Sequence, residues 1–536
     1  MKCDTVAKPK NSDLKFELAT IKLQSMLKNY LLLLFVLFFS SCVKKKTEES
    51  YVPPKPSGKS GSELAQIYCS SCHQFPEPTL LPKNIWKNGV LPNMALRLGL
   101  EADNFKLYSK YSEEELPIIL GGNIYPEKPQ IDIEDWQKII KYYVDNAPEN
   151  PIPQVKKEKV TVAFSGFEIN KIYGNIQKVP SVSCVKFNPT TKETYIAWRG
   201  NNSFIKKYDS KFSVIDSIPT TSPVSDISFK NNSLDILTLG IMDPTDLSKG
   251  SLVKINSKKG SKIILDKLTR PVQMSYGDLN QDTVEDILIC NFGNEIGNLT
   301  WYEGGNMKPH LLKYLPGARQ TYIKDMNGDK IPDIVVLMSQ AREGVFIFYN
   351  KGNGNFDEKQ VLEFSSVYGS SYIDLVDFNK DGFMDIIYAN GDNADLSISL
   401  KAFHGIRVFL NDTKNHFKQS YFFPMHGAAK AVATDFDMDG DLDIAAISFF
   451  TNPKQTPHEG FLMLNNQGNN QFKVSTFKES NFGKWMVMDV ADVDNDGDSD
   501  IILGSFLRQG YLDLEELKFK GVNPPSAIIL KNKKIK

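Results

Sequence analysis

The feature that most constrains the fold is an aspartate-rich motif that recurs five times in the second half of the chain. Each copy carries Asp or Asn at positions 1, 3, 5 and 9 and runs into an apolar stretch rich in strand-forming residues. The copies start at Asp278, Asp325, Asp377, Asp435 and Asp492, which are 47, 52, 58 and 57 residues apart. This interval is the size of one propeller blade, so the repeat predicts a ring of small sheets.

Two weaker units of the same kind precede these copies, at Ser181–Trp198 and Pro223–Leu237. Seven units in all predict an all-β, seven-bladed propeller over residues 160–536. We expect the last strand, Ala527–Leu530, to close the ring against a first strand at Val160–Phe164, because closure removes exposed sheet edges.

The aspartate motif also predicts a metal site in each loop. Side-chain oxygens at positions 1, 3, 5 and 9, with a backbone carbonyl at position 7, form an oxygen cage that suits Ca²⁺. Carboxylates grouped this closely repel one another unless a cation lies between them. The expected ligands are Asp278, Asn280, Asp282 and Asp286; Asp325, Asn327, Asp329 and Asp333; Asp377, Asn379, Asp381 and Asp385; Asp435, Asp437, Asp439 and Asp443; and Asp492, Asp494, Asp496 and Asp500.

Two other interpretations apply to these loops. An EF-hand requires Glu at position 12 and flanking helices, whereas an apolar strand follows each loop here. Acidic turns without metal are the second alternative. Gly at position 6 permits the sharp turn in three copies. Thr283 and Lys330 stand there in the other two, and the metal-free alternative applies best to the Thr283 loop.

A second motif, Cys69-Ser-Ser-Cys72-His73, is typical of covalent c-type haem attachment. The two thiols can form thioethers to the haem vinyl groups, and the adjacent imidazole can bind the iron. A structural zinc site normally needs four protein ligands, and residues 58–150 contain no other Cys or His. A redox disulfide of the thioredoxin kind belongs to a βαβ pattern, which does not surround this motif.

The segment 62–149 is expected to be a small helical domain. Ser62 can cap a helix that leads into the haem motif, and Asp132 can cap another that carries Trp136 and Tyr143 on one face. This arrangement resembles a class I cytochrome c, in which the first and last helices pack together. The resemblance implies an axial methionine, and Met94 is the only Met of the segment. The alternative role for Met94 is a core residue packed at the haem edge.

The N-terminus is a processing segment. The nine apolar residues Leu31–Phe39 are too few to span a membrane and end at Ser40-Ser41-Cys42, so we expect residues 1–41 to be a signal peptide. This boundary resembles the lipobox of bacterial lipoproteins, which implies lipidation of Cys42 and an extracytoplasmic, membrane-anchored protein. A plain signal peptide is the alternative. Residues 42–61 then form a flexible tether and 150–159 a linker.

The aspartate repeat is similar to the FG-GAP (integrin α-like) family. Tyr368-Gly369, His426-Gly427 and Phe482-Gly483 stand where that family places its Gly. The turns entering the innermost strands rim the central channel, and they carry a polar, partly basic set of side chains: Arg319, Gln320, Ser370, Lys430, Lys484 and Trp485. We expect this mouth to bind a protein or glycan ligand, with ordinary solvated loops as the alternative.

Together these features predict a lipid-anchored cytochrome that transfers single electrons, with a calcium-binding propeller as its docking scaffold. The expected cofactors are haem c and Ca²⁺, and the expected partner is a redox protein or a small donor. The formal net charge of −1 gives no reason to expect a nucleic-acid partner. The alternatives are a propeller dehydrogenase that reduces its own haem and a surface-binding module. Two further cysteines, Cys184 and Cys290, fall in apolar runs and are expected to be buried thiols, with a disulfide between them as the alternative.

Overall fold

The structure is a computed structural model of the chain. It describes residues 51–101, 110–174, 179–200, 202–230, 233–256, 260–393, 397–469, 471–507, 521 and 523–533. Residues Pro54–Lys536 form one compact unit. The predicted signal peptide and Cys42 lie outside the described residues.

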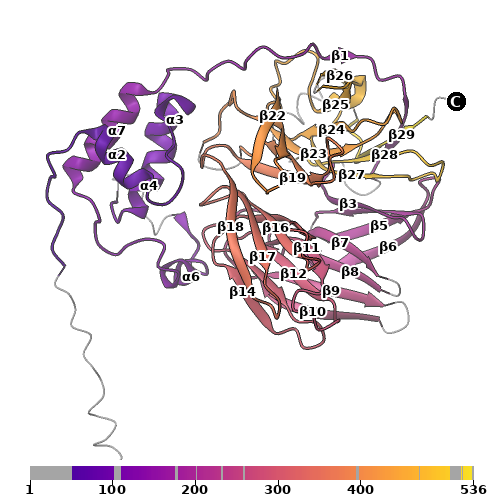
Figure 1. Cartoon of the computed structure of the whole chain (residues 1–536), viewed down its shortest axis with the longest axis horizontal. Helices are drawn as coiled ribbons and strands as arrows, with labels where there is room; N and C mark the ends of the chain where they lie inside the picture. The colour runs from indigo at the N-terminus through magenta and orange to yellow at the C-terminus, as the bar shows by residue number, and fades with distance from the viewer. Residues whose placement is uncertain are drawn as a thin grey trace, which may run out of the picture. The chain divides into compact units, whose positions relative to one another are not determined.

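Seven antiparallel sheets follow one another along the chain, as the repeat predicts (Figure 1). The first four are β3 (Val182–Asn188), β4 (Glu193–Trp198), β5 (Ser203–Tyr208) and β6 (Val214–Thr220); β7 (Val224–Lys230), β8 (Ser233–Thr238), β9 (Gly250–Asn256) and β10 (Gly260–Leu268); β11 (Pro271–Gly277), β12 (Asp286–Asn291), β13 (Asn298–Tyr302) and β14 (Pro309–Lys313); and β15 (Ala318–Lys324), β16 (Asp333–Met338), β17 (Gly344–Asn350) and β18 (Phe356–Glu363).

The remaining three blades complete the seven-bladed propeller. They are β19 (Ser370–Val376), β20 (Asp385–Asn390), β21 (Gly405–Asn411) and β22 (Phe417–Pro424); β23 (Ala428–Thr434), β24 (Asp443–Ser448), β25 (Phe461–Asn466) and β26 (Phe472–Thr476); and β27 (Trp485–Ala491), β28 (Asp500–Ser505) and β29 (Ala527–Asn532) with β2 (Phe167–Ile172). The first strand of each blade contacts the first strand of the next, all the way round from β3 to β27 and back to β3. These seven strands therefore surround the central channel.

The ring closes one strand later than the sequence suggested. Ala527–Asn532 does form the closing strand, but it pairs with β2 and not with Val160–Phe164. Thr161 and Val162 instead form β1, which pairs in parallel with β26 as a fifth strand of the preceding blade. Val160 is buried in the core of that region. The chain thus adds an edge strand to one blade before it completes the last.

The propeller core lies between adjacent blades. The second strands β12, β16, β20, β24 and β28 are buried along their whole length. Leu288 of β12, Val336 of β16 and Phe346 of β17 share one cluster across two blades. Cys184 and Cys290 are buried free thiols, which confirms their prediction.

The N-terminal segment is helical. Its helices are α2 (Gly61–Cys69), α3 (Lys83–Ile85), α4 (Leu91–Arg97), α6 (Leu116–Gly121) and α7 (Ile133–Asn146), with a 3₁₀ turn at Pro78–Leu80 and a π-helical turn at Trp86–Val90 (Figure 1). A further 3₁₀ turn, Lys478–Asn481, belongs to the propeller. None of the helices among the described residues is long and apolar enough to cross a bilayer.

Helices α2 and α7 pack against each other, as expected from the sequence. Trp136, Ile139 and Tyr143 of α7 share a buried cluster with Leu64 and Ala65 of α2. Asp132 caps α7 as predicted, and its side chain accepts a hydrogen bond from the Glu134 N–H at 2.8 Å. The cap of α2 is Ser60 and not Ser62, because Ser60 and Glu63 form a reciprocal capping box.

The helical segment also contacts the propeller. Val367 belongs to the helical core cluster, and Phe403 packs against it. Glu295, in the loop between β12 and β13, pairs with Arg97 and with Lys110, whose Nζ lies 2.7 Å from Oε1. The Tyr111 hydroxyl donates to the same carboxylate at 2.7 Å. Apolar and ionic contacts therefore both join the helices to the propeller loops.

Candidate functional site

The five aspartate loops occupy equivalent places in the fold. Each connects the first and second strands of its blade, from β11–β12 through β27–β28. The two weaker blades have short connections there, Asn188–Glu193 and 230–233. The loops therefore lie at the end of the propeller opposite to the turns that enter the first strands.

Backbone amides organise each loop around its own carboxylates. The position-1 carboxylate accepts a hydrogen bond from the N–H of position 6, as Asp377 does from Gly382 at 2.9 Å. The position-5 carboxylate accepts one from the N–H of position 7, as Asp381 does from Phe383 at 2.9 Å. The same two bonds recur in the other four loops, which shows that the motif encodes one local conformation.

Position 6 has a left-handed backbone in all five loops. Gly382, Gly440 and Gly497 adopt φ of 90°, 100° and 97°, as the motif predicts. Thr283 and Lys330 adopt φ of 70° and 71° at the same position, where a side chain makes this conformation costly. The loop fold therefore forms even where Gly is lacking.

The position-9 aspartate has a structural role that sequence reasoning missed. Asp443, 0% exposed, accepts from the Phe436 N–H through Oδ2 at 3.1 Å and from the Asn466 N–H through Oδ1 at 2.8 Å. The same pair of bonds recurs at Asp286, Asp333, Asp385 and Asp500. In four of the blades the second donor is an Asn at the end of the third strand. This recurring Asn could have indicated the hydrogen bond to the position-9 aspartate from the sequence.

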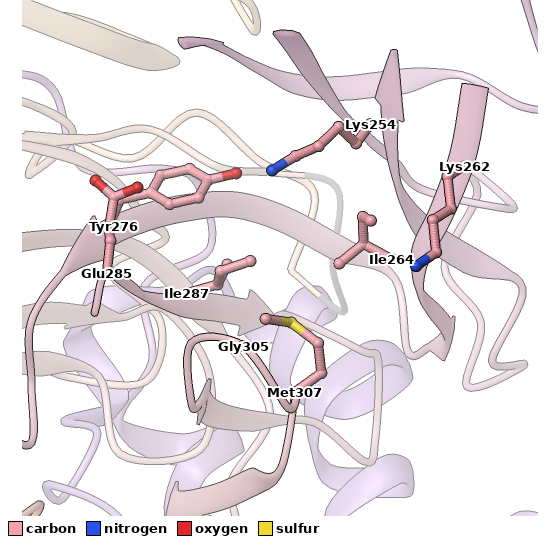
Figure 2. Close-up of a pocket in the computed structure, with 8 residues that line it drawn as sticks. All are labelled: Lys254, Lys262, Ile264, Tyr276, Glu285, Ile287, Gly305 and Met307. Carbon is pink, nitrogen blue, oxygen red and sulfur yellow. The ribbon is translucent and has the colours of Figure 1, made fainter. Parts of the chain in front are cut away.

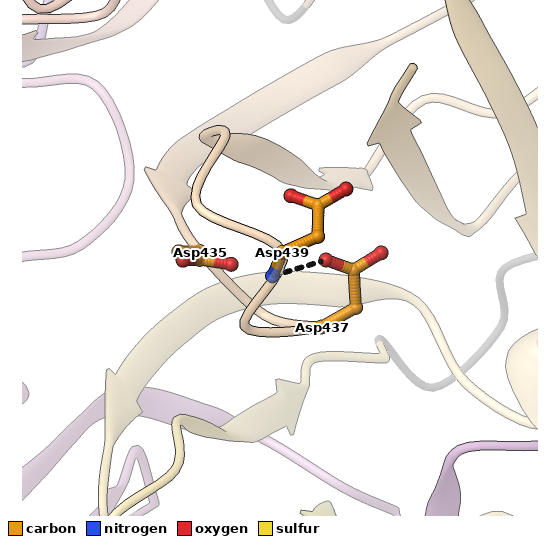
Figure 3. A group of neighbouring side chains, drawn as sticks. All are labelled: Asp435, Asp437 and Asp439. Carbon is orange, nitrogen blue, oxygen red and sulfur yellow. Dashed lines mark hydrogen bonds between the residues drawn. The ribbon is translucent and has the colours of Figure 1, made fainter. Parts of the chain in front are cut away.

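Two loops bring their carboxylates closest together. Within the described ranges, Asp435, Asp437 and Asp439 each place an oxygen within 4.8 Å of the others, and so do Asp492, Asp494 and Asp500. Figure 3 shows the first group, with the Asp439 N–H donating to Asp437 Oδ1 at 3.2 Å. Asp435 Oδ1 is buried without a hydrogen-bond donor. An all-oxygen donor set with an orphaned buried oxygen fits a hard cation.

The electrostatics of these loops agree with that fit. Burial, together with the charges of Asp437 and Asp439, raises the pKa of Asp443 to about 7. Burial and the charge of Asp494 likewise raise the pKa of Asp500 to about 7. A cation between the carboxylates would remove this mutual repulsion.

The haem motif lies at the C-terminal end of α2. Cys69 is the last residue of the helix and packs, half-buried, against the helical core cluster, whereas Cys72 is exposed. Neither forms a disulfide with a described cysteine. Burial raises the pKa of Cys69 to about 11. The motif thus begins on the face of α2 that packs against α7.

The surroundings of His73 suit the tautomer that an iron ligand needs. Its Nδ1 lies 2.9 Å from the carbonyl oxygen of Gln74, and a protonated Nδ1 donates to that oxygen. Nε2 is then the free lone pair, and this arrangement is the usual one for metal-binding histidine. Burial holds the pKa of His73 below its usual range, which favours the neutral ring.

Met94 lies in α4 and packs against the same apolar cluster as Cys69. The structure therefore brings the proposed axial methionine and the attachment motif onto one core. Over the part of the chain that is described, Cys69, Cys72 and His73 are not among the groups that gather three metal-binding atoms.

The predicted channel mouth is only partly right. Gly317, Gly369 and Gly427 do precede first strands, with φ of 95°, 67° and 68°. Ser370 and Trp485, however, are 0% exposed. Ser370 donates to Glu343 at 2.7 Å, and the Trp485 indole donates to the Ser480 carbonyl at 2.8 Å.

The other four mouth residues are half-buried. Arg319 Nε donates to the carbonyl of Ser371. Lys430 Nζ donates to the Met488 carbonyl at 2.8 Å and lies 4.7 Å from the centroid of the Tyr372 ring. Lys484 lies 5.1 Å from the Phe449 ring. The mouth is therefore a set of cations over aromatic rings.

A cavity of about 280 Å³ lies between the second and third blades (Figure 2). It is lined by Lys254, Lys262, Ile264, Tyr276, Glu285, Ile287, Gly305 and Met307. Lys254 and the Tyr276 hydroxyl both reach buried Asp235, at 3.6 and 2.8 Å. Lys254 thus pairs within the second blade, and Tyr276 joins the third blade to the second.

Comparison with known families decides the nature of the repeat. Residues 325–388 and 435–503 match the sequence profile of the FG-GAP-like repeat. The chain carries FG-GAP-like repeats. The two matches contain four of the five aspartate loops, and the Asp278 loop lies outside them. Integrin alpha-4 of Xenopus laevis is 29% identical over 141 residues, which cover 24% of this chain and 14% of that protein.

Two solved chains align with this one at low sequence identity. The Pan2 WD40 domain of Neurospora crassa is 12% identical, with a TM-score of 0.42, over 70% of this chain and 98% of that one. A protein from Lactobacillus plantarum is 8% identical, with a TM-score of 0.37, over 55% of this chain and 83% of that one.

Proposed function

We propose that the protein is a lipid-anchored, extracytoplasmic c-type cytochrome that transfers single electrons, with the FG-GAP-like propeller as its docking scaffold. One observation carries this proposal: the Cys69–His73 motif stands at the end of a helix that packs against α7. Cys42 is the proposed lipid anchor.

The residues fit a covalently held haem. Cys69 and Cys72 would form the two thioethers, His73 would be the proximal ligand, and Met94 the distal one. When bound, the haem supplies a one-electron redox centre. The chain's own contribution is positioning: α7 fixes α2, the Gln74 carbonyl orients the imidazole, and the apolar cluster limits the access of water.

The propeller's proposed role is to bind a partner. Propellers with such repeats suit an interaction module, because short loops at each end present many side chains on a rigid ring. Calcium in the aspartate loops would stiffen the end opposite the mouth. The helices contact loops of the mouth end, so a donor held there would lie close to the haem domain.

The proposal is tested by reduction kinetics of the purified protein. We expect rapid reduction by small mediators and by a donor cytochrome, and reduction by the donor should slow as salt rises. Reduction of the haem by a small organic substrate, with the purified protein alone, would instead favour a propeller dehydrogenase. An unchanged visible spectrum on adding dithionite would exclude a redox-active haem.

A further inference from the structure

Two arginines at the mouth end of the propeller share one aromatic ring. Arg270 immediately precedes β11, and Arg319 is the second residue of β15 in the next blade. Their guanidinium carbons lie 5.4 and 5.8 Å from the centroid of the Phe292 ring. The Phe292 N–H donates to the Arg270 carbonyl at 3.2 Å, which fixes the ring beside the strand ends.

Both guanidinium groups are held mainly by neutral carbonyls. Arg270 Nη1 donates to Gly293 O at 2.9 Å and Nη2 to Met242 O at 3.1 Å, while its Nε is buried without a partner. Arg319 Nε donates to Ser371 O. Among the described residues, no carboxylate oxygen lies within 4.0 Å of a guanidinium nitrogen of either arginine, which is the distance that defines an ion pair.

Two other described arginines of the propeller differ in that they bond to side chains as well. Arg199, at the same end, pairs with Asp243 at 2.8 Å. Arg407 is buried without an ion pair, but its donors reach the side chains of Asn390 and Gln419 and the Phe403 carbonyl. Arg270 and Arg319 are thus two cations with hydrogen-bond donors left over.

Holding these two charges side by side without an ion pair is unfavourable. Arginine stays protonated in proteins, and half-buried cations side by side repel one another. The charge of Asp392 acts on both arginines, and those of Asp243 and Asp246 also act on Arg270, but none of the three carboxylates forms an ion pair with either guanidinium group. A planar guanidinium group can donate two parallel hydrogen bonds to one oxyanion. The aromatic ring beside it lowers the local dielectric constant, which strengthens the attraction between the charges.

We propose that Arg270 and Arg319 bind a small oxyanion, a carboxylate or a phosphate group, over Phe292 at the mouth of the propeller. This site lies outside the haem motif and the aspartate loops, and it does not depend on either cofactor. It gives the propeller a ligand class of its own: small acidic metabolites or the acidic group of a larger ligand.

The test is titration calorimetry of the purified protein at low ionic strength, with succinate and with inorganic phosphate as separate probes. We expect one equivalent of at least one probe to bind, and the probe that binds identifies the group. R319Q and R270Q should each weaken binding at least tenfold. R319K keeps the positive charge but lacks the planar guanidinium group, so its loss of affinity should be smaller than that of R319Q.

R199Q is the matched control, because Arg199 is already paired with Asp243, and it should bind as the wild type does. If R270Q does not fold, as judged by circular dichroism, R319Q and R319K carry the test. Absence of binding by both probes up to 10 mM, on the order of the weakest specific affinities, would overturn the proposal. Equal binding by wild type and R319Q would overturn it as well.

Discussion

At the scale of single residues, the aspartate loops keep one backbone conformation at position 6 with three different residue types. Position 6 is left-handed in all five copies, whether it holds Gly, Thr or Lys. A β-branched residue is strained there, since its Cβ crowds the following carbonyl. The remaining hydrogen bonds of the loop must offset that strain at Thr283 and Lys330.

Replacing Thr283 by Gly should therefore stabilise the propeller. We expect the free energy of unfolding to rise by about 1 kcal/mol, the cost of a left-handed non-Gly residue. The reverse change, Gly440→Ala, should lower it by a similar amount. Urea unfolding monitored by circular dichroism measures both. A neutral or destabilising Thr283→Gly would show that this loop is not strained.

Met94 is the residue whose role is most open to direct test. If Met94 binds iron, Met94→Ala should remove the sulfur-to-iron charge-transfer band of the oxidised protein. The variant should bind carbon monoxide more readily and have a lower reduction potential, because Met raises the potential relative to harder ligands. Leu98, which packs against the same cluster, supplies a control as Leu98→Ala. A wild-type spectrum in Met94→Ala would assign Met94 to the core.

At the scale of elements, the sequence predicts the loops and strands well and their hydrogen-bond partners poorly. Spacing alone located the five loops and the strands that follow them, because the motif and the apolar run are local. The second donor to Asp443 is Asn466, one strand further on, so local pattern reasoning did not assign the bond. The prediction that Trp485 and Ser370 line the mouth was wrong for the same reason, because their burial depends on neighbouring segments.

Calcium removal tests the proposed role of the loops. Each occupied site should add about 1 kcal/mol at a calcium concentration about ten times its dissociation constant. A chelator should therefore lower the melting temperature of the propeller and leave the haem spectrum nearly unchanged. Asp439→Ala should cost more of this calcium-dependent stability than Asp282→Ala. A melting temperature that does not change when the chelator is added would show that the loops are metal-free turns.

At the scale of the whole molecule, the number of blades was predictable and the contacts between distant segments were not. Seven repeat units predicted seven blades, and the closing strand β29 was located correctly. Its partner β2 was missed, because two short N-terminal strands compete for the same role. The contact of Arg97 and Lys110 with Glu295 joins residues almost two hundred positions apart, and only the structure reveals it.

Glu295 should make the contact between helices and propeller sensitive to acid. Burial opposes its charge, but Arg97 and Lys110 lower the pKa of Glu295 from 4.5 to about 2. A carboxylate with a lowered pKa stabilises the fold above its unfolded pKa, and this contribution is lost as pH falls from about 4.5 towards 2. Glu295→Gln should cost about 3 kcal/mol at pH 7 and progressively less below pH 4.5.

Unfolding by urea at several pH values measures this difference. Glu114→Gln is the matched control at the same contact, because its pair with Lys249 is exposed and should contribute little. A cost for Glu295→Gln that is independent of pH would contradict the ionic account of this contact.

The central claim is that haem is covalently attached through Cys69 and Cys72, and acid–acetone extraction of the purified protein tests it most directly. The protein should be produced in a host that attaches haem c outside the cytoplasm. We predict that the red colour stays with the precipitated chain and that Cys69→Ala or Cys72→Ala leaves at most one thioether. Haem that leaves completely into the acetone, or a purified chain without haem, would contradict the account.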